Sequence, residues 1–170
     1  NIDNSSTFGV IGGGRENNLQ SSGTAILGGR SNTVSGDYGA SVGGRDNTTS
    51  GAYSGLLGGR NNTTSGAYSG ILGGKNNLVS GNGAVIAGGF GSIASGTCST
   101  IGGGTLNTGS GAYTTIAGGC GNAVVAVGTG SFIGGGKGNK ANCRYSSIAG
   151  GQGNCTNRPH TTVGGGCNNT

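Results

Sequence analysis

The sequence predicts an all-β fold, a parallel β-solenoid built from eleven coils of fifteen residues. Gly makes up 45 of the 170 residues and recurs with a fixed period rather than at random. Pairs of adjacent Gly return every fifteen residues, with a single spacing of seventeen. Only 31% of the residues are apolar, too few for packed Leu and Phe layers, so order must come mainly from backbone pairing between coils.

We predict that residues 1–170 form a single Gly- and Asn-rich repeat domain. Solenoids usually need polar caps, and neither end of this sequence shows an obvious one, so we expect a segment of a longer chain or assembly. The longest apolar runs are only a few residues, which predicts no insertion into a membrane.

Two columns of the repeat are predicted to face inward. We number the repeat so that position zero is the residue two before each invariant Gly-Gly pair. Position zero is Ile, Leu or Val in ten of eleven copies and Ser41 in the other. Position eight provides a second inner ladder, from Leu19, Val34, Thr49, Thr64, Val79, Ala94, Val124 and Ala141. Two thin ladders make a narrow core, which favours burial of one face against identical chains. A monomeric solenoid held by backbone hydrogen bonds and Asn stacking is the alternative.

Gly and Asn columns are predicted to form the corners of each coil. Positions two and three are Gly in every copy, and position six is Asn in ten of eleven, with Ser92 as the exception. Both residue types tolerate left-handed backbone geometry. Short segments between the corners, such as Leu78-Val79, are typical of strands. The predicted corner residues include Gly28, Gly43, Gly58, Gly73, Asn32, Asn47, Asn62 and Asn77.

Position four aligns five cations in successive coils. At a strand spacing of ~4.8 Å, neighbouring cations in water repel by up to ~1 kcal/mol. One interpretation is a solvated edge that prevents aggregation. The other is a docking strip for an acidic polymer, such as an anionic surface polysaccharide, or for carboxylates of a partner. The row consists of Arg15, Arg30, Arg45, Arg60 and Lys75.

Position twelve aligns aromatic side chains, which either stack on sugar rings of a glycan or cover the strand surface beneath them. No aromatic platform is interleaved with the basic row, so we expect no binding of nucleic acid. The column contains Tyr38, Tyr53, Tyr68, Tyr113 and Tyr145, together with Cys98 and His160.

Catalysis is not expected. The single His160 lies in the tenth coil, whereas the four acids, Asp3, Glu16, Asp37 and Asp46, lie at or before the third, at least roughly 30 Å away. We also predict no metal site and no cofactor, because no set of side chains has the spacing of metal ligands.

No two of the five cysteines share a column in adjacent coils, so we expect buried thiols rather than bridges within the chain.

The run Tyr-Ser-Gly-Ile-Leu-Gly-Gly at 68–74, followed by Asn-Leu-Val-Ser-Gly at 77–81, resembles the head repeats of YadA-like trimeric autotransporter adhesins. Similar repeats occur in phage and viral fibre proteins. The resemblance covers all eleven copies and implies a left-handed parallel β-roll that forms a homotrimer, lies on a bacterial surface or a virion, and serves attachment. The doubled Gly, the fifteen-residue period and the cysteines depart from the family pattern.

The function that we expect is a structural and adhesive fibre or head segment of an extracellular protein on a cell surface or virion surface. One alternative is a subunit that stacks end to end in an extracellular filament. Another is an ice-binding β-solenoid, which requires a flat Thr array. Against ice binding, Thr48-Thr49 and Thr63-Thr64 fill only two adjacent coils.

Overall fold

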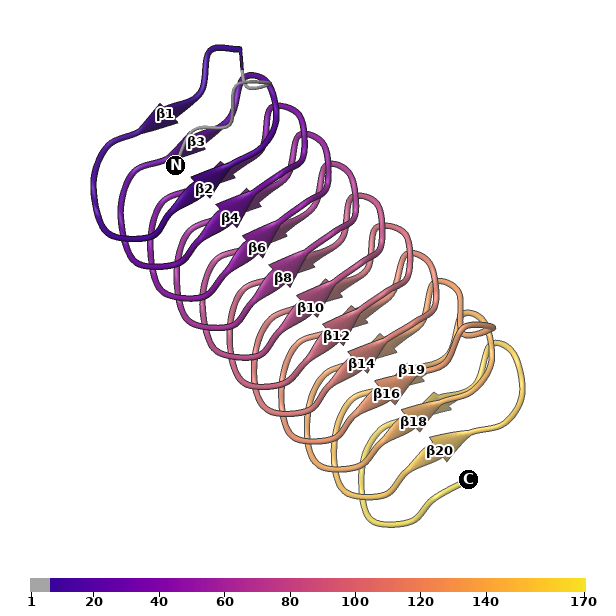
Figure 1. Ribbon diagram of the computed structural model, residues 1–170. Coiled ribbons are helices and arrows are strands. Elements are labelled where there is room, and N and C mark those ends of the chain that lie inside the picture. Colours follow the sequence, from indigo (N-terminus) through magenta and orange to yellow (C-terminus); the bar gives the residue numbers. More distant parts are fainter. Residues whose placement is uncertain (1–6) are drawn as a thin grey trace.

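The computed structural model describes residues 7–170 as a rod of stacked coils, with the first described coil at one end of the rod and the C-terminus at the other (Figure 1). Every strand is two residues long, and the strands fall into two parallel sheets. In the described range, no helix is long and apolar enough to cross a membrane.

The first sheet contains the eleven odd-numbered strands, each paired with the equivalent strand of the next coil. Leu56 pairs with Ile71 fifteen residues later, and Ile116 pairs with Ile133, so the seventeen-residue spacing is absorbed outside the sheet. The strands are β1 (Val10–Ile11), β3 (Ala25–Ile26), β5 (Ala40–Ser41), β7 (Gly55–Leu56), β9 (Gly70–Ile71), β11 (Val85–Ile86), β13 (Thr100–Ile101), β15 (Thr115–Ile116), β17 (Phe132–Ile133), β19 (Ser147–Ile148) and β21 (Thr162–Val163).

The second sheet contains the ten even-numbered strands in the same order. Each strand again pairs with the equivalent strand of the next coil, as Val79 pairs with Ala94. The parallel solenoid predicted from the repeat is therefore confirmed. The strands are β2 (Asn18–Leu19), β4 (Thr33–Val34), β6 (Thr48–Thr49), β8 (Thr63–Thr64), β10 (Leu78–Val79), β12 (Ile93–Ala94), β14 (Thr108–Gly109), β16 (Ala123–Val124), β18 (Lys140–Ala141) and β20 (Cys155–Thr156).

The core consists of the two predicted inner ladders. Because side chains alternate across a strand, the second residue of each strand points inward and the first points outward. Leu56 and Ile71 in one sheet and Val79 in the other are at most 1% exposed. Two core clusters result: one begins at Leu56 and continues toward the C-terminus, and the other contains Leu19, Ile26 and Val34.

Ser41 separates these two clusters. It occupies the inner column between Ile26 and Leu56, is 1% exposed, and its Oγ has no hydrogen-bond partner. We expect Ser41→Val to raise the free energy of unfolding by about 1–2 kcal/mol, because it removes an unpaired buried hydroxyl and joins the clusters. Urea unfolding at fixed protein concentration measures this. Ser54→Val is the matched control and should destabilise, because the Ser54 hydroxyl donates to the carbonyl of Gly51. Equal effects of the two substitutions would contradict this account of the core.

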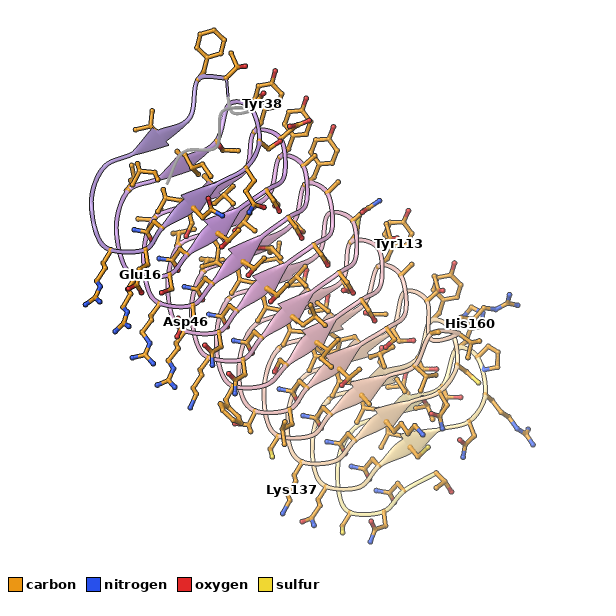
Figure 2. All side chains as sticks on the ribbon, in the orientation of Figure 1. Glu16, Tyr38, Asp46, Tyr113, Lys137 and His160 are labelled. Carbon is orange, nitrogen blue, oxygen red and sulfur yellow. The ribbon has the colours of Figure 1, made fainter. Side chains whose placement is uncertain are left out.

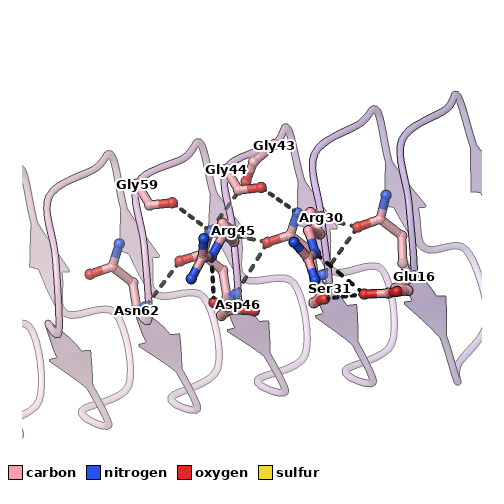
Figure 3. A network of polar contacts seen from close by, with 12 residues as sticks. Glu16, Arg30, Ser31, Gly43, Gly44, Arg45, Asp46, Gly59 and Asn62 are labelled. Carbon is pink, nitrogen blue, oxygen red and sulfur yellow. Dashed lines mark hydrogen bonds and ion pairs between the residues drawn. The ribbon is translucent and has the colours of Figure 1, made fainter.

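A ladder of buried Asn side chains runs along the rod beside the apolar core (Figure 3). Asn47 shows the pattern: its backbone N–H donates to Oδ1 of Asn32 at 3.1 Å. Its Nδ2 donates to the carbonyls of Gly43 and Gly59, at 3.2 and 3.1 Å. The Asn47 amide thus ties three successive coils together, which gives the Asn column a structural role.

Of the columns predicted to form corners, the second Gly of each pair is left-handed, whereas the first Gly and the Asn each lie one residue away from a left-handed position. Gly28, Gly43, Gly58 and Gly73 lie at a bend, but none has a φ in the left-handed region. Asn32, Asn47, Asn62 and Asn77 are buried hydrogen-bonding residues without positive φ. Left-handed positions include the second Gly of each pair, the residue before each Asn, and the tyrosine column at position twelve. In the second to fifth coils the first two sets are Gly29, Gly44, Gly59, Gly74, Ser31, Asp46, Asn61 and Asn76.

Candidate binding surfaces

The basic row and the tyrosine column lie on opposite edges of the rod. In Figure 2, Glu16, Asp46 and Lys137 mark one edge, and Tyr38, Tyr113 and His160 mark the other. The backbone of the basic row forms a third ladder of parallel bridges, in which each residue at position four pairs with its equivalent one coil on. The structure therefore aligns the five cations of the row, as the repeat predicts.

Acidic side chains at position five pair with the cations in the first part of the basic row. Glu16 accepts from Nε of Arg15 at 3.0 Å and of Arg30 at 3.4 Å. Asp46 accepts from Nε of Arg45 at 2.8 Å. All of these side chains are at least 39% exposed, so water and salt weaken the pairs.

The hydroxyl of Ser31 completes the environment of the Glu16 carboxylate. It donates to Oε2 at 3.1 Å and is the main cause that lowers the pKa of Glu16, followed by Arg30 and Arg15. A lowered pKa means that Glu16 is ionised and paired at neutral pH. Its favourable contribution is lost only as the pH falls through that lowered pKa.

The second part of the row has no acidic partner. Among residues 7–170, neither Arg60 nor Lys75 forms an ion pair, and the position-five residues beside them are Asn61 and Asn76. Lys75 Nζ lies 5.7 Å from the ring centroid of Phe90, the next residue along the column. Unbalanced positive charge therefore gathers around Arg60 and Lys75.

The tyrosine side chains stack on one another. The ring centroids of Tyr38 and Tyr53 are 5.1 Å apart, those of Tyr53 and Tyr68 are 5.0 Å apart, and both pairs are nearly parallel. Both faces of Tyr53 are thus covered, so a sugar ring can reach only its edge. Tyr113 is not stacked on another ring in residues 7–170, and Tyr145 stacks on His160 at 5.3 Å. The column consequently offers few free ring faces to a glycan.

One outer surface is free of charge along the whole rod. We call it the apolar face: the residue before and the two residues after each position-zero residue, on the outside of the odd-numbered sheet. These thirty-three positions contain only Gly, Ala, Val, Leu, Phe, Ser and Thr, although the chain has thirteen charged residues. Its large exposed side chains are Val10, Leu27, Val42, Leu57, Leu72 and Phe132, from 41% to 58% exposed.

The first Gly of each invariant pair belongs to the apolar face. No contact within the chain explains why this column lacks a side chain. A Cβ atom added at Gly58 would meet nothing within 4 Å, and the same holds for all eleven residues of this column. At eight of the eleven, φ lies outside the left-handed region. The second Gly differs, because at Gly59 φ is +88° and a Cβ would overlap the next coil. The first column therefore keeps a bare backbone stripe open on the outside.

The outer face of the even-numbered sheet is polar, and the sequence reasoning missed its hydroxyl array. Thr49 and Thr64 point inward and are fully buried. The outward Thr column is Thr33, Thr48 and Thr63, with the Ser residues of position nine beside it. Leu78 and Ile93 interrupt this column, so the Thr array spans three consecutive coils. The strand register, which fixes the outward residue, is the signal that would have identified it.

The expected burial of the cysteines is wrong. All five are free thiols; three are exposed and two are intermediate, because they lie at corners and on outward strand positions. Within residues 7–170 there is no pocket and no group of three or more side chains suited to a metal ion. Asp3 lies outside the described residues. Among the described residues, the cysteines therefore add no metal site to these surfaces.

No protein-family model matches the sequence, and no curated protein matches it either. The functional assignment therefore depends on the outer surfaces, of which the apolar face is the longest and the basic row the most charged.

Proposed function

We propose that this chain is a rigid structural and adhesive segment of a fibre or head on a cell surface or virion, assembled laterally from identical chains and without enzymatic activity. The observation that carries the proposal is the apolar face, which is uncharged over all eleven coils while every charged residue lies elsewhere. Exposed Leu and Val in contiguous columns mark surfaces that contact another protein.

The length of the apolar face favours a second copy as its occupant. The same surface recurs at every coil, so a partner that covers it must repeat with the same ~4.8 Å step, as an identical solenoid does. The face is roughly 50 Å long and roughly 13 Å wide, which gives roughly 650 Å². That area is close to the about 800 Å² that each partner buries in a standard interface. The bare Gly stripe would let two backbones approach closely.

The remaining surfaces fit an attachment role. Lateral assembly through the apolar face leaves the basic row and the tyrosine column on other edges of the rod (Figure 2). Stacked coils provide rigid length, and the outer columns repeat side chains at a fixed spacing. The resemblance to YadA-like head repeats supports three as the number of chains and supports a left-handed coil.

Charge placed on the apolar face should weaken assembly. We expect the double variant Leu57→Arg with Leu72→Arg to shift the midpoint concentration of association at least about tenfold, because each Arg would be desolvated in the interface. Light scattering after size exclusion measures the mass. The matched control is Thr63→Arg with Leu78→Arg on the outer face of the even-numbered sheet, in a column that already accepts Lys140.

The control variant should keep the mass of the unsubstituted chain. Retained assembly of the Leu57 and Leu72 variant would exclude the apolar face as the interface. Loss of assembly in the control variant would show that added charge prevents assembly on either outer face, and would equally contradict the proposal.

A further inference from the structure

The charge of the basic row is uneven along the rod. Five cations at position four face two carboxylates at position five, so the row carries 5 − 2 = +3. Both carboxylates, Glu16 and Asp46, pair with the first three arginines. Two of these three excess positive charges therefore lie at Arg60 and Lys75, in the fourth and fifth coils, where position five holds no carboxylate.

The amides beside these two cations are free to bind a ligand. Asn61 and Asn76 are exposed and left-handed, with φ of 54° and 58°, and this conformation directs both to the edge of the rod. Their backbone N–H groups donate to the carbonyls of Arg45 and Arg60, both at 3.0 Å. Their side-chain amides form no hydrogen bond with residues 7–170. An amide both donates and accepts, as hydroxyl groups of a sugar require.

An aromatic ring continues the same column. Phe90 follows Lys75 by one coil, in a continuous ladder of backbone bridges. Its side chain is 42% exposed, and Lys75 Nζ lies near its ring. Two unpaired cations, two free amides and one aromatic surface thus occupy neighbouring coils on one edge.

We propose that Arg60, Asn61, Lys75, Asn76 and Phe90 form a binding site for an acidic polysaccharide that runs along the rod. Carboxylate or sulfate groups accept hydrogen bonds from Arg60 and Lys75, with Arg suited to a bidentate contact. Sugar hydroxyls bind the two amides, and the apolar face of a sugar ring packs against Phe90. Nucleic acid fits less well, because a single ring provides no platform for successive bases. The inference rests on the proposed attachment function and names the ligand class of that function.

The site is tested by titrating the full chain with polygalacturonate at low ionic strength, with dextran as the neutral polymer and polyphosphate as the anion without sugar. We expect polygalacturonate to bind and dextran not to bind. Arg60→Gln with Lys75→Gln should weaken binding about tenfold, since it removes two charge-assisted contacts. The matched control is Lys137→Gln with Lys140→Gln, which changes the net charge equally and should weaken binding less than about twofold.

Phe90→Thr separates a sugar site from a general anion site, because Thr105 already occupies the same column one coil on. We expect this variant to weaken polygalacturonate binding several-fold and to leave polyphosphate binding unchanged. The proposal is overturned if polygalacturonate does not bind, if both double variants lose affinity equally, or if Phe90→Thr has no effect on the sugar polymer.

The mass of each preparation separates this site from the proposed assembly. Absence of polygalacturonate binding in a multimeric preparation rejects the site and leaves the assembly intact. Binding with the expected variant effects in a monomeric preparation confirms the site and rejects the assembly.

Discussion

Gly59→Ala should lower the free energy of unfolding by on the order of 3 kcal/mol or more. Gly59 has φ of +88°, a conformation that Ala adopts only with strain. The added Cβ would also overlap the carbonyl oxygen of Gly74 in the next coil and lie 2.6 Å from Nδ2 of Asn62. Since both neighbours belong to the ladder that joins the coils, the methyl group would push successive coils apart. Urea unfolding at fixed protein concentration measures the change.

Gly55→Ala is the control in the same coil. A Cβ at Gly55 would meet nothing within 4 Å, its φ is not left-handed, and Ala25 and Ala40 occupy its column in the preceding coils. We expect it to be neutral or to stabilise by up to about 1 kcal/mol, because Ala restricts the unfolded chain. If the two variants unfolded at the same urea concentration, close contact between coils at the second Gly would be disproved.

Asn62→Ala is expected to cost about 2–4 kcal/mol of unfolding free energy. Its Oδ1 accepts the backbone N–H of Asn77 at 2.9 Å, and its Nδ2 donates to the carbonyls of Gly58 and Gly74 at 3.2 and 2.9 Å. Truncation would leave a buried N–H of Asn77 and the carbonyl of Gly58 without these partners, and Asn62 itself is fully buried. A chevron or equilibrium urea series on the purified chain would quantify the loss.

Asn62→Ser provides the internal comparison, because the chain already contains Ser at this position of the repeat. Ser92 Oγ accepts the backbone N–H of Asn107 at 3.2 Å and so preserves one contact of the ladder. The Ser variant should therefore be less destabilised than the Ala variant. An Ala variant as stable as the unsubstituted protein would mean that the Asn ladder contributes nothing to the stability of the rod.

The fold follows closely from the periodicity of the sequence. Position zero and position eight are buried as predicted, except that Ile11 and Val163 in the first and last coils are only partly buried. Apolar residues that recur once per coil are buried when the coils stack in register. The corners are harder to predict, because Gly and Asn can recur in a repeat for reasons other than left-handed φ. Asn47 makes buried hydrogen bonds, whereas the left-handed residue is its neighbour Asp46.

The surfaces were only partly predictable. The alignment of Arg60 with Lys75 and the lack of acidic residues beside them follow directly from the repeat, but the pairing of Glu16 with both Arg15 and Arg30 depends on side-chain geometry. The stacking of Tyr53 between two rings depends on left-handed backbone at each Tyr, which propensity does not anticipate for a bulky residue. The apolar face depends on which residues are buried: Leu56 points inward, so its neighbour Leu57 lies on the outer surface.

Lateral assembly of identical chains is the central claim, and sedimentation equilibrium of the unsubstituted chain tests it most directly. The account predicts a mass of three times 16.0 kDa that falls toward the single-chain value only on strong dilution. A mass of 16.0 kDa at every concentration would contradict it and would leave the apolar face exposed in solution.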